Sequence, residues 1–465
     1  MRVGPTLVLT DALHKRLQAH LLPGDGLEAA AILLCTRMDV GQLKLLCKDA
    51  VLVPHDKCNR VEDYLDWPGD YLEEALDRAE DEDLSLILIH SHPGGFYEFS
   101  RTDNDSDQKV IPSLFKNREP RHPGSTVHGS AIIIPGGAIK ARLYNESMRP
   151  FAVELVAIYG DDFHLYWHDI DQPTHRPMAF TAGMRQELGR LTAAVIGYSG
   201  TGSLTAEQIT RMGIGNLIVV DFDRVEDRNL NRILNSTTAD AQAASLKVDV
   251  FQRAAAAYRL DLEAHCIPQT IASREAVLAV ARADILFCCV DSHEGRFICD
   301  AMAAAFMQPL FDVGVVIPVR TTEFGQSVIM DINGRVDYVQ PGGTTLFERG
   351  VYTPASLRAE ELAKRDPAAY AEQVKAGYMP GSVEEAPSVI SVNMLAASTC
   401  MQEFIARLYR YRLVSNREHA RTVFSLGDNE YDYFPDNAFA HEESALLASG
   451  LREPLLGIPF LGAVR

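Results

Sequence analysis

Two histidines at the end of an apolar run are the residues of this sequence best placed to do chemistry. The run LSLILI is followed directly by His90 and, two positions later, by His92. Because side chains on a strand alternate between its faces, both imidazoles point the same way and could share one metal ion. Asp103 follows after a glycine-containing loop and is the acidic candidate for a third ligand. A tetrahedral catalytic zinc needs three protein ligands and keeps a fourth position for water.

The pair His-x-His alone also fits two polar histidines at a strand end. The full pattern is more specific, because Glu28 opens an earlier apolar run, seven residues separate His92 from Ser100, and Asp103 comes three positions later. This pattern resembles the JAMM metalloprotease family, also called JAB or MPN-plus. The resemblance implies that His90, His92 and Asp103 bind zinc. It also implies that Glu28 holds the attacking water as general base and later acts as acid, and that Ser100 donates a hydrogen bond to the oxyanion.

The resemblance to the JAMM family covers about residues 5–160. That family cleaves peptide or isopeptide bonds after the C-terminal glycine pair of ubiquitin-like proteins, and the resemblance alone implies this substrate class. Two further acids, Asp105 and Asp107, are interpreted as residues that cap or decorate the following helix, and we leave them out of the site.

A glycine-rich loop, AVIGYSGTGS, forms the second candidate site. A strand, a tight turn and a helix start would aim backbone amides at a phosphate. The loop residues are Gly197, Gly200, Gly202 and Ser203. Ser199 stands where dinucleotide-binding loops usually carry glycine, and an NAD-type oxidoreductase is the obvious competing interpretation.

The polar residues beyond the loop favour ATP. Asp221 ends the next apolar run within VVDFDRVEDRNLNRIL, Lys247 lies in a later helix, and Asp291 ends a further run. An acid for the ribose, amide and cationic groups for phosphates, and an acid for magnesium are what nucleotide activation needs. Each residue alone could equally cap a turn or be a solvated charge.

The order of these residues resembles the ThiF/MoeB family, the adenylating fold of ubiquitin-activating enzymes, over about residues 183–412. The resemblance implies ribose binding by Asp221 and magnesium binding by Asp291. The residues that it implies for phosphate binding are Asn229, Arg232 and Lys247, with Arg232 also catalytic because it neutralises charge. The family's reaction is attack of a C-terminal carboxylate on the α-phosphate, giving an acyl adenylate and pyrophosphate. Relatives are usually homodimers, so we expect a homodimer through this domain.

The cysteine pattern departs from that of many relatives. No cysteine lies between Cys299 and Cys400, where relatives carry the cysteine that accepts the acyl group, and their CxxC zinc pairs are also missing. Cys400 shares an apolar helical spacing with Phe404, which predicts a core thiol and not a nucleophile. We expect no catalytic thioester cysteine, so the activated carboxylate would pass to a partner's thiol (for example of a conjugating enzyme), an amine or a sulfur donor.

The composition limits location and partners. The chain has 465 residues and a formal net charge of −19, which disfavours nucleic acid and anionic membranes. No apolar stretch approaches the roughly 20 residues of a membrane span, and the start does not resemble a signal peptide. The eight cysteines are scattered, which predicts reduced thiols and a cytoplasmic protein.

We expect an α/β chain of two enzymatic domains. The first is a JAMM-type metalloprotease domain at 1–165, followed by a linker at 166–182. Strands alternate with helices from 183 to 415, which predicts a doubly wound, mostly parallel, Rossmann-like adenylation domain. The tail at 416–465 has no assigned role. Within SVIMDINGRVDYVQ, the pair Asn333–Gly334 predicts the turn of a hairpin.

A protease that trims a tail and an enzyme that activates it would act on one substrate, a ubiquitin-like or sulfur-carrier β-grasp protein. Fusion would raise the effective concentration of the second site for the product of the first. Both maturation before activation and deconjugation for recycling fit this sequence. Two alternatives stay open: trimming and adenylation in sulfur transfer or peptide-metabolite synthesis, and an idle scaffold that binds a ubiquitin-like partner.

Overall fold

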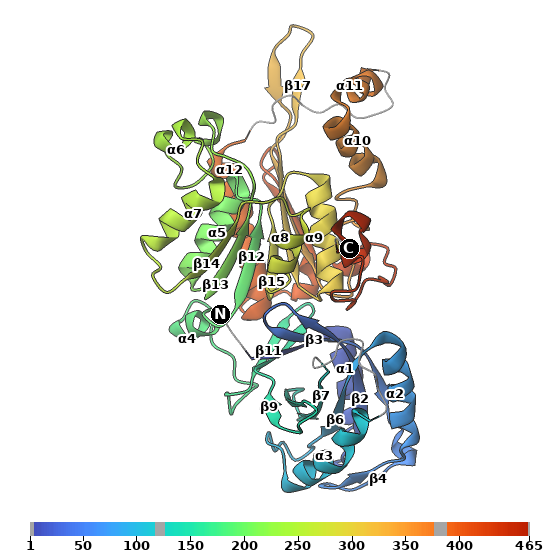
Figure 1. The fold of residues 1–465 in the computed structure, drawn as a ribbon. Coiled ribbons are helices and arrows are strands. Elements are labelled where there is room, and N and C mark those ends of the chain that lie inside the picture. The colour runs from blue at the N-terminus through green and yellow to red at the C-terminus, as the bar shows by residue number, and fades with distance from the viewer. Residues whose placement is uncertain (1–3, 117–125, 376–387, 464–465) are drawn as a thin grey trace. The chain divides into compact units, whose positions relative to one another are not determined.

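The computed structural model describes residues 4–116, 126–375 and 388–463. The chain divides into two compact units (Figure 1). The first comprises Arg2–Arg176 with Leu447–Leu451, and the second comprises Pro177–Leu446 with Arg452–Arg465. None of the helices in the described part of the chain has the length and apolar character needed to cross a bilayer.

The first unit is built on a nine-stranded mixed sheet in the order β11-β10-β1-β3-β2-β6-β7-β8-β9. Its strands are β1 (Thr6–Thr10), β2 (Ala30–Asp39), β3 (Leu43–Leu52), β6 (Ser85–Ser91), β7 (His128–Ile133), β8 (Ile139–Tyr144), β9 (Pro150–Ala152), β10 (Leu155–Tyr159) and β11 (Phe163–Trp167). A separate short pair joins β4 (Asn59–Arg60) to β5 (Leu65–Asp66).

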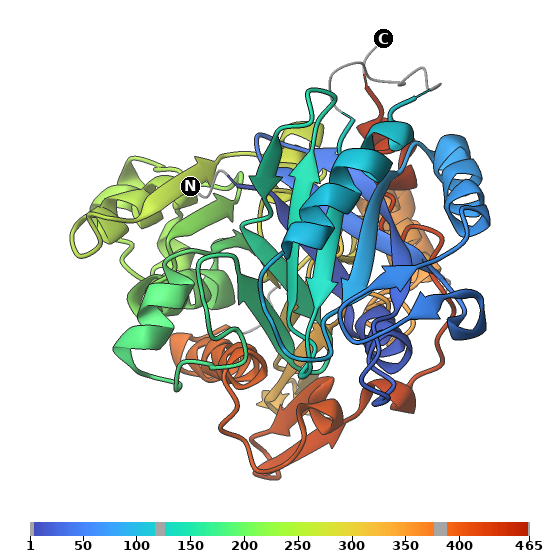
Figure 2. The same ribbon diagram turned by 90° about the horizontal axis from the view of Figure 1, so that it is seen from below.

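Helices pack on both faces of this sheet. Leu13 and Leu17 of α1 (Asp11–Leu21) belong to a buried apolar cluster on one face. Ala75 and Ala79 of α2 (Asp70–Glu82) belong to the cluster on the other face, together with Ile111 of α3 (Arg101–Leu114). Figure 2 shows α3 lying across the strands of the sheet. Leu86 and Leu88 of β6 also belong to this second face, and His90, two positions after Leu88, continues the same alternation.

The second unit contains an eight-stranded sheet in the order β14-β13-β12-β15-β16-β19-β20-β21. The first five strands are parallel and the last three pair antiparallel, so the predicted doubly wound, mostly parallel fold is confirmed. Its strands are β12 (Thr192–Ile196), β13 (Asn216–Val220), β14 (Glu263–Ile267), β15 (Ile285–Cys288), β16 (Leu310–Val316), β19 (Asn333–Val339), β20 (Arg421–Ser425) and β21 (Glu430–Phe434).

Helices cover both faces of the second sheet, with α5, α7 and α12 on one face and α8 and α9 on the other (Figure 1). The helices are α4 (Ala182–Leu188), α5 (Gly200–Met212), α6 (Thr238–Gln242), α7 (Lys247–Ala256), α8 (Arg274–Val280), α9 (His293–Ala305), α10 (Pro354–Arg365), α11 (Pro367–Lys375) and α12 (Ile390–Leu408). In this strand order β12 lies between β13 and β15, where the chain reverses direction across the sheet. Ligands of such folds bind at the carboxyl ends of the strands at that point.

The residues beyond 416 contribute to the second unit. They supply β20 and β21 to its sheet, and the Arg274 guanidinium of α8 donates to the Leu461 carbonyl at 2.6 Å and pairs with Glu453 at 2.5 Å. The predicted domain boundaries remain predictions, but the tail now has a structural contribution that its sequence did not reveal.

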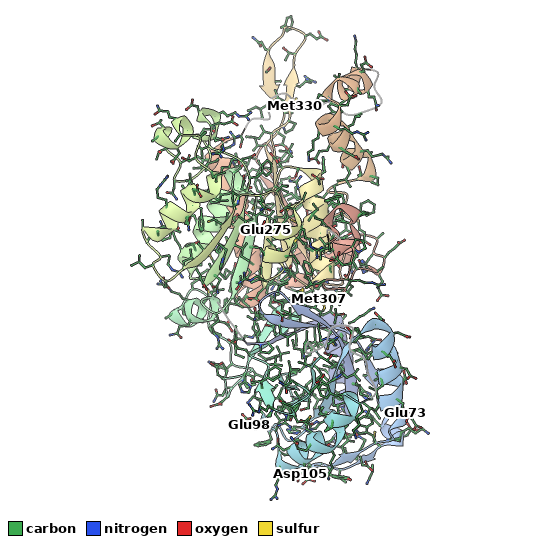
Figure 3. The ribbon with its side chains drawn as sticks, in the orientation of Figure 1. Glu73, Glu98, Asp105, Glu275, Met307 and Met330 are labelled. Atoms are coloured by element: carbon green, nitrogen blue, oxygen red, sulfur yellow. The ribbon has the colours of Figure 1, made fainter. Side chains whose placement is uncertain are left out.

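The predicted hairpin turn at Asn333–Gly334 is wrong. Both residues lie inside β19, with Gly334 opposite Val315 of β16 and Phe424 of β20. A Cβ at Gly334 would overlap the Phe424 ring, so this glycine makes room for a packed aromatic side chain. The hairpin that does form joins β17 (Val319–Thr321) to β18 (Ser327–Ile329). It projects from the sheet in Figure 1, and Met330, labelled in Figure 3, lies near its base.

Candidate metal centre and nucleotide site

Strand pairing positions the first two candidate residues beside each other. Ala30 of β2 is the partner of His90 on β6, and Glu28 lies two residues before Ala30. The Glu28 backbone is fixed on both sides, since its amide donates to the Val61 carbonyl at 3.1 Å and its carbonyl accepts from Arg60 Nε at 2.6 Å. The Glu28 carboxylate is therefore brought to the histidines by backbone contacts.

A capping box at the start of α3 positions Ser100 and Asp103. The Ser100 hydroxyl oxygen accepts from the Asp103 amide at 3.1 Å, and Asp103 Oδ2 accepts from the Ser100 amide at 2.6 Å. Reciprocal bonds of this kind fix the first turn of a helix. The serine and the aspartate of the sequence pattern thus hold each other in place.

The donor atoms converge in a geometry that fits zinc. His90 Nε2 lies 3.0 Å from His92 Nε2, and Asp103 oxygens lie 3.1 Å and 3.5 Å from these two nitrogens. Zinc bonds of about 2.0–2.1 Å in a tetrahedral site separate ligand atoms by roughly 3.3 Å. Glu28 and the two histidines also offer ligand atoms within 4.8 Å of one another. His92 Nδ1 lies 2.7 Å from the Phe96 carbonyl and must donate to it, which leaves Nε2 free to bind a metal.

The pKa values of the two carboxyl groups in the cluster, Asp103 and Glu28, are shifted in opposite directions. Burial would raise the pKa of Asp103, but hydrogen bonds from His90 and His92 outweigh it and hold the pKa well below its usual range. Asp103 is therefore ionised, as a ligand must be. Burial raises the pKa of Glu28, and the nearby histidines offset part of this effect. A carboxylate with a raised pKa is a stronger base.

A cleft of about 250 Å³ adjoins these residues. Glu28, His90 and Asp103 line it together with the apolar side chains of Leu72 and Leu88. A substrate chain could reach the cluster through such a cleft, because pockets for ligands combine apolar walls with a few polar groups.

In the second unit, each glycine of the predicted phosphate loop meets a different constraint that excludes a larger side chain. Gly197 follows β12 with a φ of 89°, in the left-handed region. A Cβ at Gly202 would overlap the Gly197 carbonyl, and one at Gly200 would overlap the side-chain amide of Asn393. The loop is thus packed tightly against α12, and the Ser199 side chain does not cap α5. Ser203 is buried and its hydroxyl oxygen accepts from the Leu234 amide at 3.1 Å, so it holds the loop from inside.

Asp221 and Lys247 meet near this loop. The Asp221 carboxylate accepts from the Tyr198 amide at 2.6 Å and from the Asp223 amide at 2.8 Å. Lys247 Nζ lies 2.7 Å from Asp223 and 3.9 Å from Asp221, although Lys247 is buried. Burial raises the pKa of Asp221, and Lys247 partly offsets this. Lys247 is thus a buried cation beside two acids, and the sequence did not indicate Asp223.

Of the remaining predicted nucleotide residues, Arg232 lies beside the loop and Asp291 follows a strand adjacent to β12. The Arg232 side chain approaches the Cβ position of Gly200 at 3.5 Å, and its guanidinium donates to the Arg228 carbonyl at 2.8 Å. Asn229 is buried, and its oxygen accepts from the Glu226 amide at 3.0 Å. Asp291 is exposed just beyond β15, which is parallel and adjacent to β12.

Comparison with known proteins decides the family. The family model described as "ThiF family" matches residues 175–441, more than half of the chain. The chain belongs to the ThiF family. A second model, "Prokaryotic homologs of the JAB domain", matches residues 10–147. The predicted fusion of a JAB-type domain with a ThiF domain is therefore confirmed.

Curated relatives match part of the ThiF domain. "Ubiquitin-like modifier-activating enzyme 5" of Drosophila willistoni is 29% identical over 186 residues, which is 37% of this chain and 41% of that protein. The protein of the same name from Caenorhabditis elegans is 29% identical over 167 residues, 34% of this chain and 36% of that protein. The alignments span about two fifths of the length of these relatives.

Solved structures of low identity are also similar. The Microcin C7 biosynthetic enzyme MccB in complex with N-formylated MccA has a TM-score of 0.43 and 16% identity, covering 57% of this chain and 70% of that one. E. coli MccB with ATP has a TM-score of 0.40 and 15% identity, covering 57% and 68%.

Cys400 lies inside α12 and is fully buried. Burial raises the pKa of its thiol well above the usual value. A buried neutral thiol is a poor nucleophile.

Besides Asp223, three residues that lie beside the two candidate sites were not identified from the sequence. Asp105 and Asp107 were interpreted as residues that cap or decorate the following helix; Asp105, labelled in Figure 3, is exposed, but Asp107 is buried. Arg142, 35 positions later, contacts Asp107. Asn393 packs on the phosphate loop. A polar residue within an apolar helical stretch was the available signal for Asn393, and the spacing of four from Asp103 was the signal for Asp107.

Proposed function

We propose that this chain is a bifunctional enzyme of a bacterial-type ubiquitin-like protein pathway. Its JAB unit would cleave a peptide or isopeptide bond at the C-terminal tail of a ubiquitin-like protein with zinc. Its ThiF domain would adenylate the terminal carboxylate with ATP and Mg²⁺. The convergence of His90, His92, Asp103 and Glu28 in a chain that also carries a ThiF domain supports this proposal most strongly.

In the cleavage step, a bound zinc ion would supply a Lewis acid that polarises a carbonyl and lowers the pKa of water. Glu28 takes the proton of the attacking water and returns it to the leaving amine. The Ser100 oxygen already accepts from the Asp103 amide, so its hydroxyl hydrogen can donate to the developing oxyanion.

In the adenylation step, the first-turn amides of α5 receive phosphate oxygens. Lys247 and Arg232 neutralise their charge, while Asp221 accepts from the ribose hydroxyls and Asp291 binds Mg²⁺. The carboxylate attacks the α-phosphate, an acyl–phosphate bond forms and the bond to pyrophosphate breaks. The buried Cys400 supports transfer of the activated acyl group to an acceptor outside this chain. Because homodimers are common in this family, we propose one here, which light scattering would test.

The decisive experiment is the intact mass of a candidate ubiquitin-like protein carrying a C-terminal extension, incubated with the enzyme with or without ATP and a zinc chelator. We expect trimming that the chelator blocks, and an ATP-dependent adenylate on the trimmed form only. Binding without a change in mass would favour an idle scaffold. A reductant-sensitive adduct with this chain that disappears in Cys400→Ala would contradict transfer without a thioester.

A further inference from the structure

A largely buried arginine contacts the helix that carries Ser100 and Asp103 at several points. Arg142 lies on β8, and its side chain is only 13% exposed. Its guanidinium stacks on the Phe99 ring, with 3.8 Å between its carbon and the ring centroid, and donates to the Asn104 side-chain oxygen at 2.5 Å. It also pairs with the Asp107 carboxylate at 2.7 Å.

These three contacts lie on both sides of residues 100–103, the first turn of α3, which carries Ser100 and Asp103. Phe99 immediately precedes Ser100, Asn104 immediately follows Asp103, and Asp107 lies one helical turn beyond Asp103. The planar guanidinium can meet all three because it offers several donors in a fixed plane and a flat face for an aromatic ring. A lysine ammonium keeps the charge but has neither the plane nor the flat face.

The Asp107 carboxylate, which accepts from Arg142, is also fixed by two other hydrogen bonds. Asp107 Oδ2 accepts from the Ser130 hydroxyl at 2.5 Å and from the Tyr144 hydroxyl at 2.7 Å, and it is buried. Ser130 is the cross-strand partner of Arg142, so side chains of both β7 and β8 hold the Asp107 carboxylate. Asp107 and Ser130 also line the cleft that adjoins the metal centre.

We propose that Arg142, acting through Asp107, is a positioning residue of the metal centre, which sets the Asp103 carboxylate at ligand distance from His90 and His92. The capping box fixes Ser100 and Asp103 relative to each other but does not tie this turn to the sheet. Arg142 bonds the turn to β8, two strands from β6, and adds to the contacts of Asp107 with Ser130 and Tyr144. The inference rests on the proposed zinc chemistry.

The test compares Arg142→Lys with a matched control in the full chain. Arg37 on β2 is 10% exposed, pairs with Asp83 at 2.6 Å and donates to Ser85 at 3.3 Å. Arg37→Lys therefore removes a similarly buried guanidinium from the same unit. We expect Arg142→Lys to lower zinc affinity, measured by competition with a chromogenic chelator, by roughly 10- to 100-fold. It should lower kcat for tail cleavage similarly with KM unchanged, whereas Arg37→Lys should change neither quantity.

Hydrogen exchange of the metal-free protein gives a readout that does not depend on activity. Arg142→Lys should accelerate exchange of the Asp103 and Asn104 amides, and Arg37→Lys should not. If Arg142→Lys does not fold, Asn104→Ala removes one of the three contacts at an exposed position and should lower zinc affinity in the same direction by a smaller factor.

Wild-type zinc affinity and turnover in Arg142→Lys would overturn the inference, and so would equal losses in both lysine variants, because these would reflect general destabilisation. Failure of the wild-type chain itself to bind zinc would instead overturn the proposed zinc chemistry, together with the inference that rests on it.

Discussion

At the scale of single residues, the proposed cleavage mechanism gives Glu28 and the two histidines different roles. Glu28 is held by its own backbone contacts and lies within reach of both imidazoles, whereas Asp103 lies beside the Nε2 atoms of both histidines and is the proposed third ligand. We expect Glu28→Gln to keep its bound zinc but to lose roughly 100- to 10,000-fold in kcat for tail cleavage, because the amide cannot accept a proton. Metal analysis and kinetics of the same preparation would measure both quantities.

Asp105→Asn is the matched control, because Asp105 is an exposed carboxylate on α3. It should leave zinc content and kcat unchanged. A Glu28→Gln protein that cleaves at the wild-type rate would remove Glu28 from the mechanism, and one that loses its zinc would make Glu28 a ligand.

The residues that could be found from sequence are those whose spacing along the chain reflects their chemistry. His90 lies on β6 and His92 directly follows its last residue, Ser91, while Ser100 and Asp103 are three apart at a helix start, so local geometry alone brings each pair together. Arg142 could not be found in this way, because its contacts with α3 depend on how distant strands pair. A local pattern carries no information about such contacts.

At the scale of elements, strand pairing around Gly334 overrides the local preference of the Asn-Gly pair for a turn. The pair Asn-Gly favours a tight turn, yet the residues around it extend β19 because both neighbouring strands pair with it. We expect Gly334→Ala to lower the free energy of unfolding by about 1–3 kcal/mol, since its methyl group would displace the Phe424 ring. Urea unfolding would measure this, and no loss would show that the ring can move aside at little cost.

Asp300 ties α9 to the segment that follows β19, and this contact should depend on pH. Asp300 accepts from the amides of Leu346 and Phe347 at 3.0 Å and 3.2 Å and from the Tyr352 hydroxyl at 2.8 Å. Burial raises the pKa of Asp300 from 3.8 to about 6, and these hydrogen bonds limit the rise. Between pH 3.8 and about 6 the folded protein therefore holds a proton that the unfolded chain has released, so the contribution of Asp300 to stability, complete at lower pH, is lost as the pH rises through about 6.

Tyr352→Phe tests this linkage. The hydroxyl stabilises the carboxylate more than the neutral acid, so its loss should cost about 1.5–3 kcal/mol near pH 8 and about 0.5–1.5 kcal/mol near pH 4.5. Chemical denaturation at the two pH values would measure both losses. An equal loss at both would contradict the raised pKa of Asp300.

At the scale of the whole molecule, each proposed activity has its residues inside one compact unit. The candidate metal cluster lies within Arg2–Arg176, and the residues proposed to bind the nucleotide lie within Pro177–Leu446. We expect a zinc chelator to abolish tail cleavage and to leave ATP–pyrophosphate exchange on an already trimmed substrate unchanged. Conversely, Arg232→Ala should lose pyrophosphate exchange and keep cleavage, because Arg232 belongs to the loop region of the second unit. Loss of exchange on chelation would mean that the metal also supports the ThiF domain, and that the two activities are coupled through more than a shared substrate.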